Sequence, residues 1–224
     1  MNKIKEILDV LATLQENLLS LPDDMLLSIN PRDNESLDRG YQFIKSFNEN
    51  MNQFTDSASK IEAQIKAHFE MNPEEEDVEK ESSDVQRRER IVKELDRTAP
   101  HYLNEDFTYK RPYGFILGDS AYKGIKTWKN LYLHVLKDLQ EKFPEKFSRL
   151  PEEEKFISSR GNKIFARDKT VLRLAEELEN GVYAEVNLSA NHIRNNIRDL
   201  FDYFKVGSKI KIYLREDRDA AEEG

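Results

Sequence analysis

The stretch GVYAEVNLSANHIRNNIRDLFDYFKVGSKIKIYL, from Gly181 to Leu214, decides the fold. Residues 182–187 alternate apolar and polar side chains with the period of a half-buried strand. Ser189 follows at a position where its hydroxyl can accept a backbone N–H from the first turn of a helix. Gly207 marks the expected end of that helix, and residues 209–214 alternate again. The stretch therefore predicts a strand, a capped helix and a closing strand.

The expected helix, residues 189–204, has two unlike faces. Its inner face carries apolar side chains at helical spacing, namely Ile193, Ile197, Leu200, Phe201 and Phe204. Its opposite face carries amides and cations, namely Asn191, Arg194, Asn195 and Arg198. The inner face predicts a core, and the outer face is a candidate binding surface.

The region upstream of this stretch predicts the rest of a small domain, residues 106–215. Residues 113–117 and 122–126 alternate around a Gly-Asp-Ser turn and predict a hairpin. Thr127 can cap a helix that reaches Phe143 and ends at Pro144. Residues 163–167 are a short strand candidate, whereas residues 171–178 read as a helix or a turn. An acidic tail, residues 216–224, follows.

The N-terminal segment, residues 1–70, predicts a helical coiled-coil module. A first amphipathic helix is expected to end at Pro22, and Ser36 can cap a second that reaches Phe69. The second would span roughly 50 Å at about 1.5 Å per residue. Its apolar side chains keep an a/d seam over about four heptads, which is typical of a coiled coil. The predicted oligomerisation residues are Leu37, Tyr41, Ile44, Phe47, Met51, Phe54, Ile61 and Ile65. The first helix is too short to cover this seam, so we expect a homo-oligomer.

Residues 71–105 predict an acidic linker with one short helix. Residues 72–85 are rich in acids and almost free of bulky apolar groups, which is typical of a flexible, self-repelling segment. Residues 85–97 carry sparse apolar side chains at helical spacing. The fold class expected from the sequence is thus α+β: a coiled-coil module joined by an acidic linker to a small mixed domain.

Composition narrows the functional classes. Charged residues make up 35% of the 224 residues, hydrophobic residues make up 38%, and the formal net charge is −8. No apolar run approaches the roughly 20 residues that span a bilayer, so we expect no membrane association. The chain has no cysteine, which excludes disulfides, thiolate zinc sites and a cysteine nucleophile. A cytoplasmic location is the expectation.

The sequence shows no catalytic constellation. We interpret the four histidines, residues 68, 101, 134 and 192, as structural or solvent-exposed side chains rather than as metal ligands. No glycine-rich phosphate loop is present. The run Glu153-Glu154-Lys155 is the local match to a nuclease pattern, but it lies in a Pro-led acidic turn. We therefore predict a protein that is not an enzyme, with no cofactor and no metal site.

Basic side chains interleaved with aromatic residues make nucleic acid a candidate ligand, because such patterns hold phosphates and stack bases. The candidate nucleic-acid-binding residues are Lys123, Lys126, Lys129, Arg160, Lys163, Asn191, Arg194, Asn195 and Arg198. The alternative is that the hairpin aromatics form a core and the cations are ordinary solvated side chains.

Three short segments of the C-terminal half carry a resemblance to a known type of domain. They are KRPYGF from Lys110 with Thr127-Trp-Lys, SRGNKIF from Ser159, and GVYAEVNLSAN from Gly181. Together they resemble an uncharacterised bacterial domain associated with restriction and phage-defence loci. The resemblance covers residues 107–215 and leaves out the helical half. It implies a DNA-linked or antiviral-defence context and transfers no functional residue.

The sequence thus predicts a non-enzymatic, homo-oligomeric DNA-binding protein. The main alternative is an adaptor whose α+β domain docks on a partner enzyme, with the basic residues left in solvent. A third hypothesis, an unrecognised nuclease, has the least support, since no active site is found.

Overall fold

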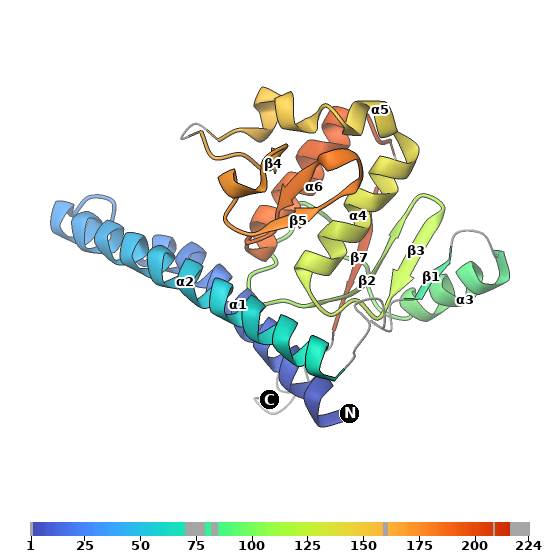
Figure 1. The fold of residues 1–224 in the computed structure, drawn as a ribbon, viewed down its shortest axis with the longest axis horizontal. Helices are drawn as coiled ribbons and strands as arrows, with labels where there is room; N and C mark the ends of the chain where they lie inside the picture. Colours follow the sequence, from blue (N-terminus) through green and yellow to red (C-terminus); the bar gives the residue numbers. More distant parts are fainter. Residues whose placement is uncertain (1, 70–78, 82–84, 159–160, 208, 216–224) are drawn as a thin grey trace.

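A computed structural model describes residues 2–69, 79–81, 85–158, 161–207 and 209–215. The fold is mixed α+β, as the sequence predicts: two long helices precede a C-terminal part that contains the β-sheets (Figure 1). The expected acidic tail, Arg160 and most of residues 70–84 lie outside the described residues. The predicted domain boundaries stay a prediction.

The two long helices form a hairpin that we call the arm. Helix α1 spans Asn2–Ser28 and α2 spans Asn34–His68, with Asp33 as the N-cap of α2. The prediction that Pro22 ends the first helix is wrong, because α1 continues for six residues beyond it. Contacts on both sides of Pro22 hold the helix against the rest of the chain and offset the backbone hydrogen bond that proline cannot donate.

The remaining described residues, 79–81, 85–158, 161–207 and 209–215, form what we call the body. Its larger sheet is antiparallel, in the order β1-β3-β2-β7. Strands β2 (Pro112–Leu117) and β3 (Ser120–Lys123) are the predicted hairpin. Strand β7 (Lys211–Leu214) pairs with β2, and β1 (Glu79–Glu81) pairs with β3. The order places the last strand of the chain beside the first strand of the hairpin.

Two helices start from hydroxyl caps, as predicted. Thr127 caps α4 (Trp128–Lys142) by accepting from the backbone N–H of Asn130 at 3.1 Å. Ser189 caps α6 (Ala190–Phe204) by accepting from the backbone N–H of His192 at 3.4 Å. The predicted inner face of α6 is buried along its whole length. The N-cap predictions for Thr127 and Ser189 are confirmed, whereas the prediction that Ser36 caps the second long helix is wrong, because Asp33 is the N-cap of α2 and accepts from the N–H of Glu35.

The smaller sheet is also antiparallel, in the order β4-β6-β5. Its strands are β4 (Phe165–Ala166), β5 (Ala175–Glu177) and β6 (Tyr183–Glu185). The short turns around them are α5 (Pro144–Phe147) and four 3₁₀ turns at Leu150–Glu152, Glu154–Phe156, Lys169–Val171 and Glu179–Gly181. The expectation of a helix or turn over residues 171–178 is wrong in part, because β5 lies there. The strand–helix–strand unit also joins two sheets, since β6 and β7 belong to different ones.

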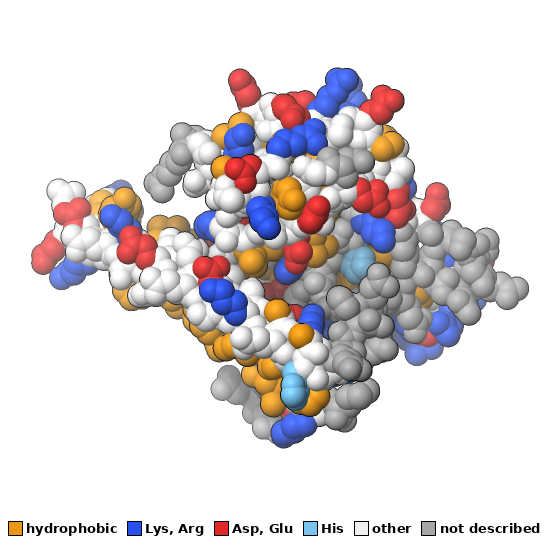
Figure 2. Space-filling model, in the orientation of Figure 1, with side chains coloured by type: hydrophobic (Ala, Val, Ile, Leu, Met, Phe, Trp, Pro, Cys, Tyr) orange, Lys and Arg blue, Asp and Glu red, His pale blue; other side chains and the backbone are white. Residues whose placement is uncertain are grey.

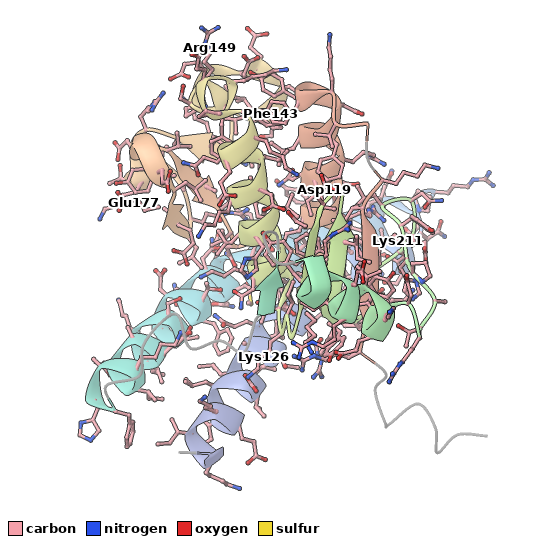
Figure 3. The ribbon with its side chains drawn as sticks, turned by 90° about the vertical axis from the view of Figure 1, so that its right-hand side faces the viewer. Asp119, Lys126, Phe143, Arg149, Glu177 and Lys211 are labelled. Atoms are coloured by element: carbon pink, nitrogen blue, oxygen red, sulfur yellow. The ribbon has the colours of Figure 1, made fainter. Side chains whose placement is uncertain are left out.

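The body is layered. Helices α4 and α6 lie between the two sheets (Figures 1 and 3), and one continuous core includes Trp128, Phe115 and Ile197. Helix α3 (Val85–Leu95) packs on the other face of the larger sheet, where Ile91 and Leu95 are buried against Ala121 and Tyr213. The short helix expected within the linker is therefore part of the body's packing.

Helix α6 ends at Phe204, three residues before the predicted glycine. Lys205 takes the left-handed conformation, with φ of 57°, and its N–H donates to Asp202 O and Phe201 O. The N–H of Val206 also donates to Phe201 O, at 2.9 Å. A left-handed residue satisfies the last carbonyls of a helix in this way. Gly207 is not needed for that role.

Candidate interaction surface

Three acids at seven-residue intervals line one side of α1: Asp9, Glu16 and Asp23. Seven residues are close to two helical turns, so the three carboxylates project from the same side. Each contacts the body. The sequence-based prediction did not include these acids, because the apolar spacing of α1 gives no information about them.

Glu16 sits at the start of α4. Its carboxylate accepts from the backbone N–H of Trp128, in the first turn of that helix. A carboxylate there satisfies a free N–H and interacts favourably with the helix dipole. Burial nevertheless raises the pKa of Glu16 to about 7, even though the N–H groups of Trp128 and Lys129 and the charges of Arg111 and Arg215 act to lower it.

Asp23 repeats this arrangement at α6. Its Oδ2 accepts from the hydroxyl of Ser189, the N-cap residue, at 3.1 Å. Nearby, the buried amide of Asn187 binds two residues of α2. Its Nδ2 donates to Asn52 Oδ1 at 3.2 Å, and its Oδ1 accepts from the hydroxyl of Thr55 at 3.3 Å. Both helices of the arm are therefore bonded to the segment just before and at the start of α6.

A groove of about 430 Å³ lies between the arm and α4. Six of the charged side chains that line it are paired within the chain. Lys126 Nζ lies 2.9 Å from Asp9 Oδ2, Lys129 Nζ lies 2.5 Å from Glu176 Oε1, and Lys66 Nζ lies 2.8 Å from Glu62 Oε1. A charged ligand would have to displace one of these partners. The groove thus serves first as the contact between arm and body.

The predicted nucleic-acid-binding lysines are distributed over separate places. Lys126 lies beside α1 (Figure 3), and Lys129 lines the same groove. Lys123 is next to α3, where its Nζ donates to Glu94 Oε2 at 2.7 Å. Lys163 is exposed on the approach to β4, and Arg160 lies outside the described residues. Lys123, Lys126 and Lys129 thus each contact an acid.

The amide and cation face of α6 is bonded largely to the chain itself. Asn191 accepts from the N–H of Phe107 at 3.0 Å and donates to Asp106 Oδ1 at 2.7 Å. Arg194 donates to Glu105 O at 2.5 Å, and both Arg194 and Arg198 donate to Asn195 Oδ1. These contacts attach the loop before β2 to α6. Arg198 is the exposed cation of this group.

The side of the arm that faces away from the body is apolar. Ile7, Val10 and Leu14 of α1 and Phe43 and Ile61 of α2 have exposed fractions between 45% and 63%. Figure 2 shows hydrophobic side chains along the lower edge of the arm, opposite the body. We call these five residues, with the positions between them on the same helix sides, the outward face. It is the largest group of exposed apolar side chains on the described arm.

The outward face has heptad spacing on both helices. On α1 the positions are Ile7, Val10, Leu14, Asn17 and Leu21, and on α2 they are Phe43, Phe47, Asn50, Phe54, Ser57 and Ile61. None of these side chains is charged. The rings of Phe43 and Phe47 stack, with centroids 5.9 Å apart.

The predicted oligomerisation residues are divided between two environments. Met51 is buried, as are Thr55 and Ala58, on the side of α2 turned to the body. Phe47, Phe54 and Ile61 belong to the outward face. Leu37 and Tyr41 are exposed near the start of α2, and Ile44 and Ile65 are partly buried. The heptad spacing alone does not show which of these apolar residues face the body and which belong to the outward face.

The described residues contain neither a metal-binding cluster nor a helix that could span a membrane. No group of three or more histidines, aspartates or glutamates in this part of the chain is arranged to hold a metal ion. Likewise, none of the described helices combines the length and the apolar character needed to cross a membrane.

The comparisons with known proteins found nothing similar. No family model matches the chain, and neither the curated proteins nor the solved structures gave a match. The link to restriction and phage-defence loci, which rests on the resemblance of three short sequence segments, stays a prediction.

Proposed function

We propose that this chain is a non-enzymatic interaction module that pairs with a second copy of itself through the outward face of its arm. The observation that carries the proposal is the exposure of five large apolar side chains, Ile7, Val10, Leu14, Phe43 and Ile61, on one uncharged side of a helical hairpin. Exposed apolar patches of this kind mark sites of protein association. The body is then held at a fixed place relative to the dimer by the arm contacts.

The partner must match a face without charges. Burying a charge against this face would cost free energy unless the charge found a partner, so a strongly acidic or basic partner is disfavoured. A second outward face fulfils the requirement, because both helices carry heptad seams. Asn17 and Asn50 lie within these seams, and an asparagine at such a position fixes register and partner number at a cost in stability.

Two hairpins related by a two-fold axis would form a four-helix bundle. In such an arrangement each outward face meets the same residues of the other copy, which is the self-complementary contact of most homodimers. The α2 helix is 35 residues long and α1 is 27. Helix α1 therefore leaves part of α2 uncovered within one chain, and a second arm supplies the missing cover.

DNA binding, the first expectation from the sequence, receives less support than self-association. Lys123, Lys126 and Lys129 are paired with Glu94, Asp9 and Glu176. The N-terminus of α6 lies against Asp23 of the arm, so it is not open to a phosphate. Phosphate contacts supply most of the affinity for DNA, and here three of the candidate cations, Lys123, Lys126 and Lys129, already have acidic neighbours.

The test is the mass of the protein in solution. We expect the wild-type chain to sediment as a dimer at about 50 μM, since association depends on protomer concentration. The variant Val10→Asp with Ile61→Asp should be a monomer, because it places one acid in each seam and a buried charge without a partner is costly. A monomeric wild type at this concentration would contradict the proposal.

Leu27→Asp is the matched control. Leu27 is 87% exposed, but it follows Asp23 by four residues and so lies on the acid side of α1. Leu27→Asp likewise replaces an exposed apolar side chain by an acid, but outside the outward face, so it should leave the dimer intact. If Leu27→Asp dissociated it as well, a general effect of charge would explain the result and the outward face would lose its assigned role.

A further inference from the structure

Glu16 is an ionisable group placed across the contact between arm and body. It belongs to α1, it accepts from the backbone of α4, and its neighbours in the groove include the apolar side chains of Ala12, Leu19 and Leu133. A charged carboxylate enclosed in this way loses much of its hydration. Undocking of the arm would return it to water.

We propose that Glu16 is a proton-sensitive clasp, which holds the arm tightly against the body when its carboxyl is protonated and more loosely when it is charged. The protonated group keeps a carbonyl oxygen that accepts from the N–H of Trp128, so the hydrogen bond survives while the desolvation cost disappears. This inference does not rest on self-association, because the clasp lies on the opposite side of α1 from the outward face.

The charged groups around the clasp come from every packed element. Arg111 and Arg215 of the body act on Glu16 directly and favour its charged form. The other ionisable groups that line the groove are Lys5 and Asp9 of α1, Glu62 and Lys66 of α2, Lys126, Lys129 and His134 at or in α4, and Glu176 of β5. His134 also lines the groove, so the test separates its contribution from that of Glu16.

The direction of the pH effect follows from linkage. The pKa of Glu16 is raised from 4.5 to about 7 in the docked state, so the docked arm binds a proton more tightly than the free arm. Docking is therefore strongest below pH 4.5 and weakens as the pH rises to about 7. Between about pH 5.5 and about pH 7.5 the undocking equilibrium constant should rise on the order of tenfold.

The experiment measures the distance between arm and body within one copy. The chain has no cysteine, so Lys3→Cys on α1 and Lys137→Cys on α4 provide two unambiguous sites for spin labels. Both side chains are exposed. The labelled protein is diluted into an excess of unlabelled protein, so that any pairing of copies adds no label-to-label distance. Double electron–electron resonance then reports the distances at the two pH values.

We expect one short distance at low pH and a second, longer population that grows at high pH. Glu16→Gln, which stays neutral and keeps an acceptor oxygen, should give the short distance at both. An unchanged wild-type distribution would overturn the proposal. A Glu16→Gln variant with the same pH response as the wild type would also overturn it and assign the response to His134. His134→Gln should leave the wild-type response in place.

Discussion

At the scale of single residues, local capping could be predicted from sequence and long-range partners could not. Thr127 and Ser189 act within their own helices, so spacing alone identified them. Glu185 and Asn187 were expected on the polar side of a half-buried strand, yet both are buried. Glu185 is covered by the segment before β5, and Asn187 by α2. Nothing in the local pattern indicates which distant segment covers a strand.

Glu185 gives a prediction at this scale. Its Oε2 accepts from the N–H of Arg173 at 2.8 Å, and its Oε1 accepts from the N–H groups of Asn187 at 2.7 Å and Leu174 at 3.3 Å. In Glu185→Gln either orientation of the amide points an NH₂ group at a backbone donor. The free energy of unfolding should fall by about 2 kcal/mol, a typical cost of an unsatisfied buried group.

Urea unfolding measures this loss, and Glu177→Gln is the control. Glu177 lies on the neighbouring strand β5 and is exposed. The same chemical change there should alter the free energy of unfolding by less than about 0.5 kcal/mol. Equal effects at the two positions would mean that the hydrogen bonds of Glu185 contribute little.

At the scale of elements, periodicity located the long helices and the hairpin, while ends and pairings were less predictable. The inner face of α6 follows from its 3.6-residue period, which burial on one side imposes. Strand β5 has three residues and too short a pattern to be distinguished from a turn. The pairing of β7 with β2 joins segments about 100 residues apart, and no local signal specifies it.

The end of α6 gives a prediction at this scale. Lys205 holds a φ of 57°, a conformation that costs an L-residue roughly 1 kcal/mol and costs glycine little. Lys205→Gly should therefore raise the free energy of unfolding by about 0.5 kcal/mol, after the larger entropy of glycine in the unfolded chain is subtracted. Thermal unfolding provides the measurement.

Gly207→Ala is the companion change. A Cβ at Gly207 would meet nothing within 4 Å, and its φ lies outside the left-handed range. Alanine should be neutral or raise stability by about 0.5 kcal/mol. If Gly207 stopped the helix, as the sequence indicates, alanine would instead lower stability by about 1 kcal/mol.

At the scale of the whole molecule, the sequence predicted two modules but not the contact between them. The composition change near residue 70 made a boundary plausible, and the acids of α1 looked like ordinary solvated groups. The structure brings Asp9, Glu16 and Asp23 to Lys126 and to the starts of α4 and α6. Hydrophobic periodicity does not predict polar contacts of this kind. The seven-residue spacing of the three acids, however, is visible in the sequence.

The arm contact also predicts how the molecule unfolds. Ala58 is 2% exposed, on the side of α2 that is turned to the body, so an arginine there must either bury its charge or separate the arm from the body. Ala58→Arg should lower the unfolding midpoint reported by Trp128, the sole tryptophan of the chain, by an amount equivalent to about 2–3 kcal/mol.

Trp128 belongs to the body, at the start of α4, so its fluorescence reports on the body rather than on the arm. Ala63→Arg makes the same substitution at an exposed position of α2 and should leave the midpoint unchanged. If both variants have the same unfolding midpoint as the wild type, arm and body are independent folding units. The contacts of α1 with α4 then contribute no stability to the body.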